Sequence, residues 1–213
     1  LWPCRLYSIE NSKAAEQFRR VGPQKYAEWP YFGPARAHQG LLAGNRDAGH
    51  GTLTMQLEHP QMQNWYAFDE GGASGEGGWT SPLRSGWKKT RAMPHGWAIA
   101  EVTLLLRDSI AFEDSDRLVL LAGVPEKWFT HSDGMIVEGL PTHFGRLGFE
   151  YKFANGEGGM VLSGTAQPPG GFLLCLPQAG VQTIAADGKE IAVGPDGRVL
   201  LTRGTKEVRI RWM

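Results

Sequence analysis

Short apolar runs separated by turn residues fill the last hundred residues of the chain, from about Arg117 to Met213. In the clearest run, residues 147–153, leucine, phenylalanine and tyrosine alternate with glycine, glutamate and lysine. This two-residue period is typical of a strand with one buried face. Strands that recur every eight to twelve residues indicate a sandwich or a barrel, and we expect an antiparallel β-sandwich. The other predicted strands are residues 118–121, 135–137, 160–162, 172–176, 181–184, 190–193, 199–202 and 208–212.

Two Asp-Gly pairs lie between predicted strands of this region. Asp187-Gly188 and Asp196-Gly197 consist of residue types that tolerate positive φ, the backbone geometry of tight hairpin turns. We therefore predict a hairpin at each pair.

The residues before the strands follow a helical pattern instead. Start and stop signals, such as Pro34 and the pair Gly44-Asn45, delimit segments of helical length. Three helices are predicted, at residues 13–20 with Ser12 as the N-cap, at 34–43 and at 47–57.

A fourth helix is predicted from Pro94 to about residue 112. It is apolar on nearly every side, and a helix of that kind is expected to be buried. The acidic residues 113–116 then mark the expected domain boundary. The prediction is an α+β chain, in which a short helical and loop-rich segment, residues 1–114, precedes an antiparallel β-sandwich, residues 115–213.

Composition excludes several classes of partner. Lysine plus arginine and aspartate plus glutamate number 22 each, so no basic surplus indicates nucleic-acid binding. No apolar stretch approaches the roughly 18 residues of a membrane span. The two cysteines form no metal spacing, and Cys175, within an apolar run, is expected to be a small buried hydrophobe. The histidines form no metal-binding pair and no cofactor fingerprint occurs, so we predict neither metal nor cofactor.

A glycine-rich stretch, residues 69–93, interrupts the helical region. Glycines between positions 71 and 78 exclude a stable helix or central strand. Long loops of this kind are usually functional or disordered. Trp79 and Trp87 within it argue against simple disorder.

Two motifs near the start of the strand region resemble a known junction. Residues 120–128 read LLAGVPEKW, and residues 137–142 read VEGLPT. They resemble the end of bacterial (α/α)6-toroid glycoside hydrolases, such as the inverting α-L-fucosidase group. In that group the last buried helix leads into an LLP-x-x-P-x-x-W segment and a V-x-G-L strand, which opens a C-terminal β-sandwich. The helix around residues 93–101 is similar to that last toroid helix.

The resemblance implies carbohydrate as the ligand class. Because the residues before the sandwich have room for only part of a toroid, it also implies the remainder of a larger chain, or a self-association partner, as a second partner. The start Leu-Trp-Pro-Cys is likewise expected of a chain that has been processed or cut from something longer.

Hydrolysis of a glycosidic bond normally requires two carboxyl groups. Asp69 and Glu70 follow an aromatic run and precede the glycine stretch, which contains Glu76. A carboxyl group beside aromatic rings can have a raised pKa, as a general acid requires. The alternative is that Asp69 and Glu70 end a helix and Glu76 is solvated.

Four tryptophans are candidate sugar platforms, because a flat indole packs on the C–H face of a pyranose. Core packing is the alternative for each, and it is favoured for the tryptophan on the buried helix, Trp97. His95 could hydrogen-bond a sugar hydroxyl or satisfy backbone carbonyls near a helix start. The candidate substrate-binding residues are Trp65, Trp79, Trp87, His95 and Trp97.

Three functions follow from these patterns. The first is the C-terminal portion of a glycoside hydrolase acting on plant or microbial polysaccharide or oligosaccharide. It predicts an open apolar face on residues 1–112 when this chain stands alone. The second is a non-catalytic carbohydrate-binding module that uses the loop tryptophans. The third is a structural accessory β-sandwich that binds no small ligand.

Overall fold

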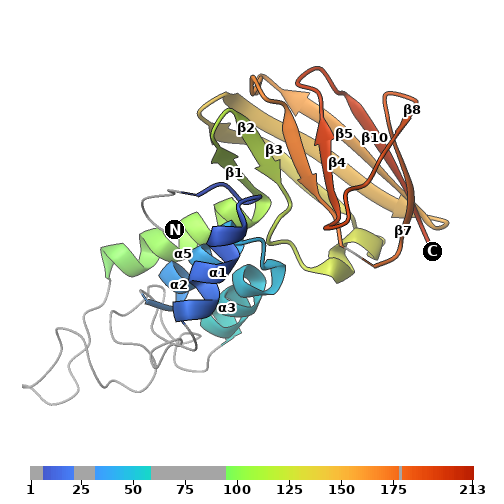
Figure 1. Ribbon diagram of the computed structural model, residues 1–213. Helices are drawn as coiled ribbons and strands as arrows, with labels where there is room; N and C mark the ends of the chain where they lie inside the picture. Colours follow the sequence, from blue (N-terminus) through green and yellow to red (C-terminus); the bar gives the residue numbers. More distant parts are fainter. Residues whose placement is uncertain (1–6, 22–31, 59–94, 178) are drawn as a thin grey trace, which may run out of the picture. The chain divides into compact units, whose positions relative to one another are not determined.

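The computed structural model describes residues 7–21, 32–58, 95–177 and 179–213 (Figure 1). Four helices precede two mostly antiparallel sheets among these residues, so the predicted α+β class is confirmed. The chain divides into two compact units, Leu1–Ser109 and Ile110–Met213. None of the described helices has both the length and the apolar character needed to cross a membrane.

Side chains just before the helices cap their first turns. Asn11 Oδ1 accepts a 3.0 Å hydrogen bond from the N–H of Lys13, so Asn11 rather than the predicted Ser12 caps the first helix. Asn45 Oδ1 accepts the N–H of Ala48 in the same way, at 3.2 Å. The described helices of this unit are α1 (Ser12–Val21), α2 (Phe32–Leu42), α3 (Arg46–Glu58) and α5 (Gly96–Ile110).

Helix α5 is buried on one side only. Ala98, Val102 and Leu105 form its buried apolar stripe. Trp97, by contrast, is 63% exposed, so the expectation that this tryptophan packs in a core is wrong. The expectation of a helix buried on all sides fails for a physical reason: apolar composition shows that a face could be buried, but not that another element covers it.

The second unit is a sandwich of two sheets (Figure 1). A four-stranded sheet has the order β1-β2-β6-β9, formed by Ala111–Asp114, Arg117–Leu120, Phe172–Cys175 and Arg198–Leu201. A six-stranded sheet has the order β3-β4-β5-β10-β7-β8, formed by Met135–Thr142, Gly145–Ala154, Glu157–Gly164, Glu207–Trp212, Val181–Ala186 and Lys189–Ile191. Neighbouring strands are antiparallel except for the parallel pair β2 and β6.

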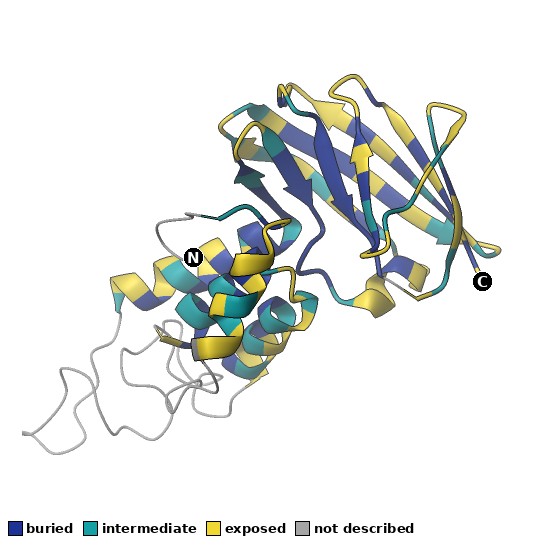
Figure 2. Ribbon diagram, viewed as in Figure 1, coloured by how far each residue is buried: buried dark blue, intermediate teal, exposed yellow. Residues whose placement is uncertain are grey.

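A single apolar core lies between the two sheets (Figure 2). Leu147, Phe149 and Tyr151 of β4 point into it, while Glu150 and Lys152, each of which precedes or follows one of them, are exposed. This alternation is the pattern that predicted the strand. Each of the predicted strand runs overlaps a strand in the structure, and Cys175 is buried as expected.

Strand β1 had no counterpart in the sequence prediction, which treated its acidic residues as part of the boundary. Ala111 pairs with Leu120 and Asp114 with Arg117, so β1 is an edge strand of the four-stranded sheet. The Asp114 carboxylate lies 3.9 Å from the Arg117 guanidinium, which offsets the cost of placing an acid there. The division between the two units accordingly precedes this strand.

The two Asp-Gly pairs differ in outcome. Asp187 and Gly188 have φ of 48° and 78° and join β7 to β8, so the predicted hairpin is confirmed. Backbone N–H groups of Glu207 and Lys206 donate to the Asp187 carboxylate at 2.9 and 3.0 Å, and these bonds lower its pKa. Asp196-Gly197 instead connects β8 to β9, which belong to different sheets, so the hairpin predicted there is wrong.

Candidate functional site

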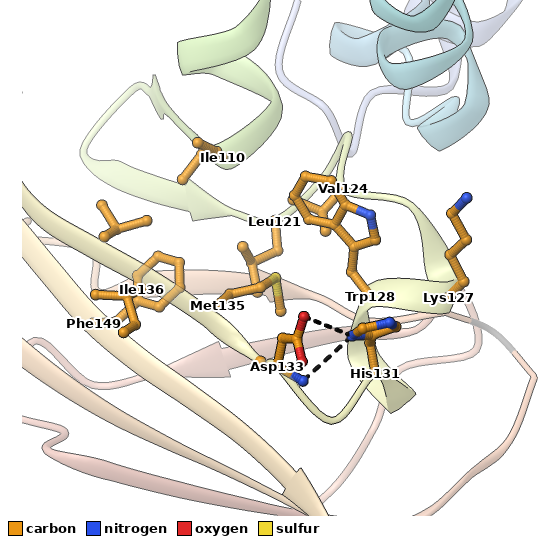
Figure 3. A pocket seen from close by; sticks show the side chains of 12 residues that line it. Ile110, Leu121, Val124, Lys127, Trp128, His131, Asp133, Met135, Ile136 and Phe149 are labelled. Carbon is orange, nitrogen blue, oxygen red and sulfur yellow. Dashed lines mark hydrogen bonds and ion pairs between the residues drawn. The ribbon is translucent and has the colours of Figure 1, made fainter.

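A pocket of about 730 Å³ opens in the sandwich unit, along the connection between β2 and β3 (Figure 3). Its volume is within the range of roughly 300–1,000 Å³ that is typical of small-ligand sites. The connection contains the 3₁₀ helix η2 (Glu126–Thr130) and the turn that follows it. Both segments supply side chains to the pocket, together with β3 and β4.

Phe129 fixes η2 to the sandwich core. Its side chain is fully buried, with ring centroids 5.9 Å from Tyr151 and 5.8 Å from Trp212. The Tyr151 hydroxyl also donates a 2.6 Å hydrogen bond to the Phe129 carbonyl. Burial raises the pKa of Tyr151 to about 12, so this phenol remains a donor throughout the neutral range. Both the side chain and the backbone carbonyl of Phe129 therefore attach η2 to the core.

Trp128 faces the pocket because its neighbour faces the core. Successive residues of a 3₁₀ helix, with about three per turn, point in clearly different directions. Trp128 is 43% exposed, and Figure 3 shows its indole on the side of the pocket where Leu121 and Val124 lie. An anchored phenylalanine thus positions an accessible tryptophan.

Polar groups stand at the edge of the pocket. The backbone N–H of Asp133 donates to Nδ1 of His131 at 3.3 Å, and the Asp133 carboxylate lies 3.7 Å from the same nitrogen. While Nδ1 accepts that bond in the neutral ring, Nε2 carries the hydrogen and can donate to a ligand. Lys127 adds an ammonium group from η2. The edge therefore offers donors and an acceptor, with one charge of each sign.

Gly134 sets the direction of the turn before β3. It has φ of 68°, and a side chain there would collide with the backbone carbonyl of Tyr151. Its N–H donates to the carbonyl of His131 at 3.2 Å, which closes the turn. This close approach places His131 and Asp133 beside the pocket.

The floor of the pocket is apolar and rigid. Val124, Met135 and Phe149 are buried members of the sandwich core. Leu121, also buried, has φ of 59°, which leucine rarely adopts, and its N–H donates to the Ile110 carbonyl at 2.7 Å. Strained residues of this kind are found where surrounding structure enforces them, often at functional sites.

Most of the predicted site residues lie outside the described part of the chain. This applies to the three candidate acids, Asp69, Glu70 and Glu76, and to three tryptophans, Trp65, Trp79 and Trp87. Their proposed roles stay predictions.

His95 and Trp97 are described and lie together at the start of α5. Their ring centroids are 6.0 Å apart in an edge-to-face arrangement. His95 Nδ1 accepts the N–H of Ala98 at 3.2 Å, so this histidine caps the helix start by accepting a backbone N–H, whereas the expected bond was to backbone carbonyls. The exposed indole of Trp97 is accessible, as a platform requires.

A buried polar cluster in the helical unit was absent from the predicted sites. His38 of α2 lies between two carboxylates of α5, with Nδ1 3.4 Å from Glu101 Oε2 and Nε2 3.7 Å from Asp108 Oδ2. Arg107 pairs with Asp108 at 2.9 Å. The spacing of Glu101 and Asp108, two helical turns apart, was the available signal. The cluster links α2 to α5, and the described residues contain no group of histidine, cysteine and acidic side chains suited to a metal ion.

Trp128, His131 and Asp133 were also missed as site residues. Trp128 entered the sequence interpretation only as the end of the LLAGVPEKW motif. No protein-family model matches the chain, and no curated protein matches it either.

Proposed function

We propose that this chain is the C-terminal portion of a carbohydrate-active enzyme, a glycoside hydrolase of the helical-toroid type acting on plant or microbial polysaccharide or oligosaccharide. The observation that carries the proposal is the apolar surface of α5. Trp97 and Leu104, seven residues apart, lie on one flank of its buried stripe and are exposed. Ile99 and Leu106 lie on the other flank and are exposed as well. A helix in the wall of a toroid has a neighbour on each side, which suits apolar flanks.

The course of the chain after α5 supports the same proposal. The helix ends at Ile110, and the first strand of the sandwich begins at the next residue, Ala111. The V-x-G-L motif lies in β3, where the pairing register shifts between Val137 and Leu140. Gly139 has φ of 64° at this irregularity, and this backbone geometry explains the glycine of the motif.

The proposed chemistry needs a pair of carboxyl groups, one to protonate the leaving oxygen and one to act as base or nucleophile. Asp69 or Glu70 remains the candidate for the first role, and Glu76 for the second. These roles belong to the proposal, as does carbohydrate as the substrate.

The α5 surface gives a direct test with the full chain. We expect an apolar fluorescent dye to bind, or the protein to self-associate during sedimentation. The double substitution Leu104→Gln and Leu106→Gln should reduce either effect. Leu200→Gln is the matched control, because Leu200 is an exposed leucine on the sandwich unit. A compact monomer that binds no dye would overturn the proposal.

A second test concerns the gene. The reading frame upstream of Leu1 should encode helical hairpins that could complete a toroid. An upstream sequence of a different class would contradict the proposal. The protein encoded by the whole reading frame should also hydrolyse a polysaccharide. Loss of this activity on Asp69→Asn or Glu70→Gln would support the proposed catalytic role of these acids.

A non-catalytic carbohydrate-binding role is the second candidate. The pocket beside Trp128 favours it, because an accessible indole there adjoins groups that can hydrogen-bond hydroxyls. This role is compatible with the first, since a sandwich can hold substrate for a catalytic unit.

A further inference from the structure

We propose that the pocket beside Trp128 binds a sugar ring of an uncharged glycan, with Trp128 as the platform and His131, Asp133 and Lys127 as partners of its hydroxyl groups. This inference rests on the proposed carbohydrate function and assigns a binding site to the sandwich unit. The site uses none of the loop tryptophans or candidate acids predicted from the sequence.

The accessible surface of the pocket defines the class of ligand. The floor residues are buried and offer little area, whereas Trp128 is 43% and Ile136 66% exposed. The most exposed groups that a ligand meets are therefore one indole, one aliphatic side chain and three polar groups, beside the half-buried Ile110 and Val137. A purely apolar ligand would remove water from those polar groups without replacing its hydrogen bonds.

Charge narrows the class further. The Lys127 ammonium group and the Asp133 carboxylate have opposite charges, so the edge of the pocket has no net charge that would select an anion or a cation. A neutral ligand with many hydroxyl groups can use both partners, because a hydroxyl both donates and accepts hydrogen bonds. A pyranose also has a C–H face that packs on an indole.

The platform is held in place before any ligand arrives. The buried Phe129 side chain and the Tyr151 hydrogen bond fix η2, and Gly134 fixes the turn that follows. Binding then has little backbone to order, which lowers its entropic cost. The polar partners come from segments adjoining these fixed points.

Calorimetry on the full chain tests the site. The probes are cellotetraose, xylotetraose, mannotetraose and galactotetraose, with tetragalacturonate as the charged comparison. We expect at least one neutral tetraose to bind. Trp128→Ala should weaken that binding at least tenfold, and Asp133→Asn by several-fold, while Trp128→Phe should restore part of the loss. Leu200→Ala is the matched control, because it removes an exposed apolar side chain of the sandwich unit that does not line the pocket, and it should leave binding unchanged.

The possible failures are distinguishable. Neutral-glycan binding that survives both Trp128→Ala and Asp133→Asn would overturn this site but leave the carbohydrate function intact. Tighter binding of tetragalacturonate would overturn the uncharged class of ligand. Binding of none of the probes would overturn the inference, whereas the toroid proposal is judged separately by the dye and sedimentation behaviour of the α5 variants. Unchanged thermal unfolding of Trp128→Ala would establish that its effect is local.

Discussion

The Tyr151 hydroxyl donates a 2.6 Å hydrogen bond to the backbone carbonyl of Phe129. Tyr151 belongs to a central run of β4, and Phe129 belongs to the short helix η2. The bond is buried, so the hydroxyl and the carbonyl could not form a hydrogen bond with water instead if the other group were lost. It connects the core of the six-stranded sheet to the segment that presents Trp128.

Replacing Tyr151 with phenylalanine should therefore destabilise the sandwich. The variant keeps the ring but leaves the Phe129 carbonyl without this donor, which should lower the free energy of unfolding by about 1–2 kcal/mol. Urea unfolding followed by circular dichroism measures the change. Glu150→Gln, on the exposed side of the same strand, is the control and should change little. Equal stability of wild type and Tyr151→Phe would show that the bond contributes nothing.

Stability at alkaline pH should depend on the same phenol. Burial raises the pKa of Tyr151 from 10.0 to about 12, so the unfolded chain loses this proton at lower pH than the folded chain. The contribution of the protonated Tyr151 phenol to the free energy of unfolding is complete below pH 10 and is lost as the pH rises towards 12. With about 1.4 kcal/mol for each pKa unit, the loss should be of order 2–3 kcal/mol. Urea unfolding at several pH values measures it, and Tyr151→Phe should lack this part of the slope. If the free energy of unfolding of wild type and of Tyr151→Phe depended on pH in the same way, Tyr151 would not be the group responsible.

Adjacent aromatic residues of η2 should lose very different amounts of stability on truncation. Phe129→Ala removes a fully buried ring from the core and should cost about 3–5 kcal/mol of stability. Trp128→Ala removes a ring that is 43% exposed and should cost less than about 1 kcal/mol. Thermal unfolding of the two variants makes the comparison. Similar losses would mean that Trp128 is a core residue and not a presented one.

Gly134 should be intolerant of a side chain. Alanine at φ of 68° is strained by roughly 1–2 kcal/mol, and its methyl group would also collide with the Tyr151 carbonyl. We expect Gly134→Ala to lower the free energy of unfolding by at least about 2 kcal/mol. Gly159→Ala is the matched control, since no atom lies within 4 Å of the position of its added methyl group. A Gly134→Ala protein as stable as Gly159→Ala would contradict the close approach.

The buried cluster should stabilise the helical unit. Asp108 is 1% exposed and lies near His38 and Arg107, so Asp108→Ala leaves buried polar groups without their carboxylate. The expected loss is about 3 kcal/mol, visible as earlier melting of the helical circular dichroism signal. Asp47→Ala, at an exposed position of α3, should have almost no effect. Equal effects of the two substitutions would show that the buried ion pairs stabilise the helical unit no more than an exposed one does.

The strands and helices were predictable because their signals are local. The alternation in β4 reflects which side chains point to one face, and this depends only on residues two apart. The Asp187-Gly188 hairpin follows from the positive φ that both residues adopt. Strand β1 was missed because its acidic residues oppose a strand, and it forms only through pairing with β2.

The candidate site depended on longer-range contacts. Nothing local distinguishes Trp128 from Phe129, since both are aromatic neighbours in one segment. The difference is that the Phe129 ring packs against Tyr151 and Trp212, which lie on strands distant in the chain. His38 and Asp108 likewise come from helices far apart in the chain.

The sequence by itself determined that a helical segment precedes a sandwich, because periodicity and turn chemistry act over a few residues. It also determined that α5 has apolar flanks, since the spacing of its apolar residues fixes that. Only the tertiary structure decided which of those flanks are covered, which aromatic residue faces the pocket and which charges are buried together. Those outcomes depend on packing between elements distant in the chain, and burial is a property of the neighbours as much as of the residue.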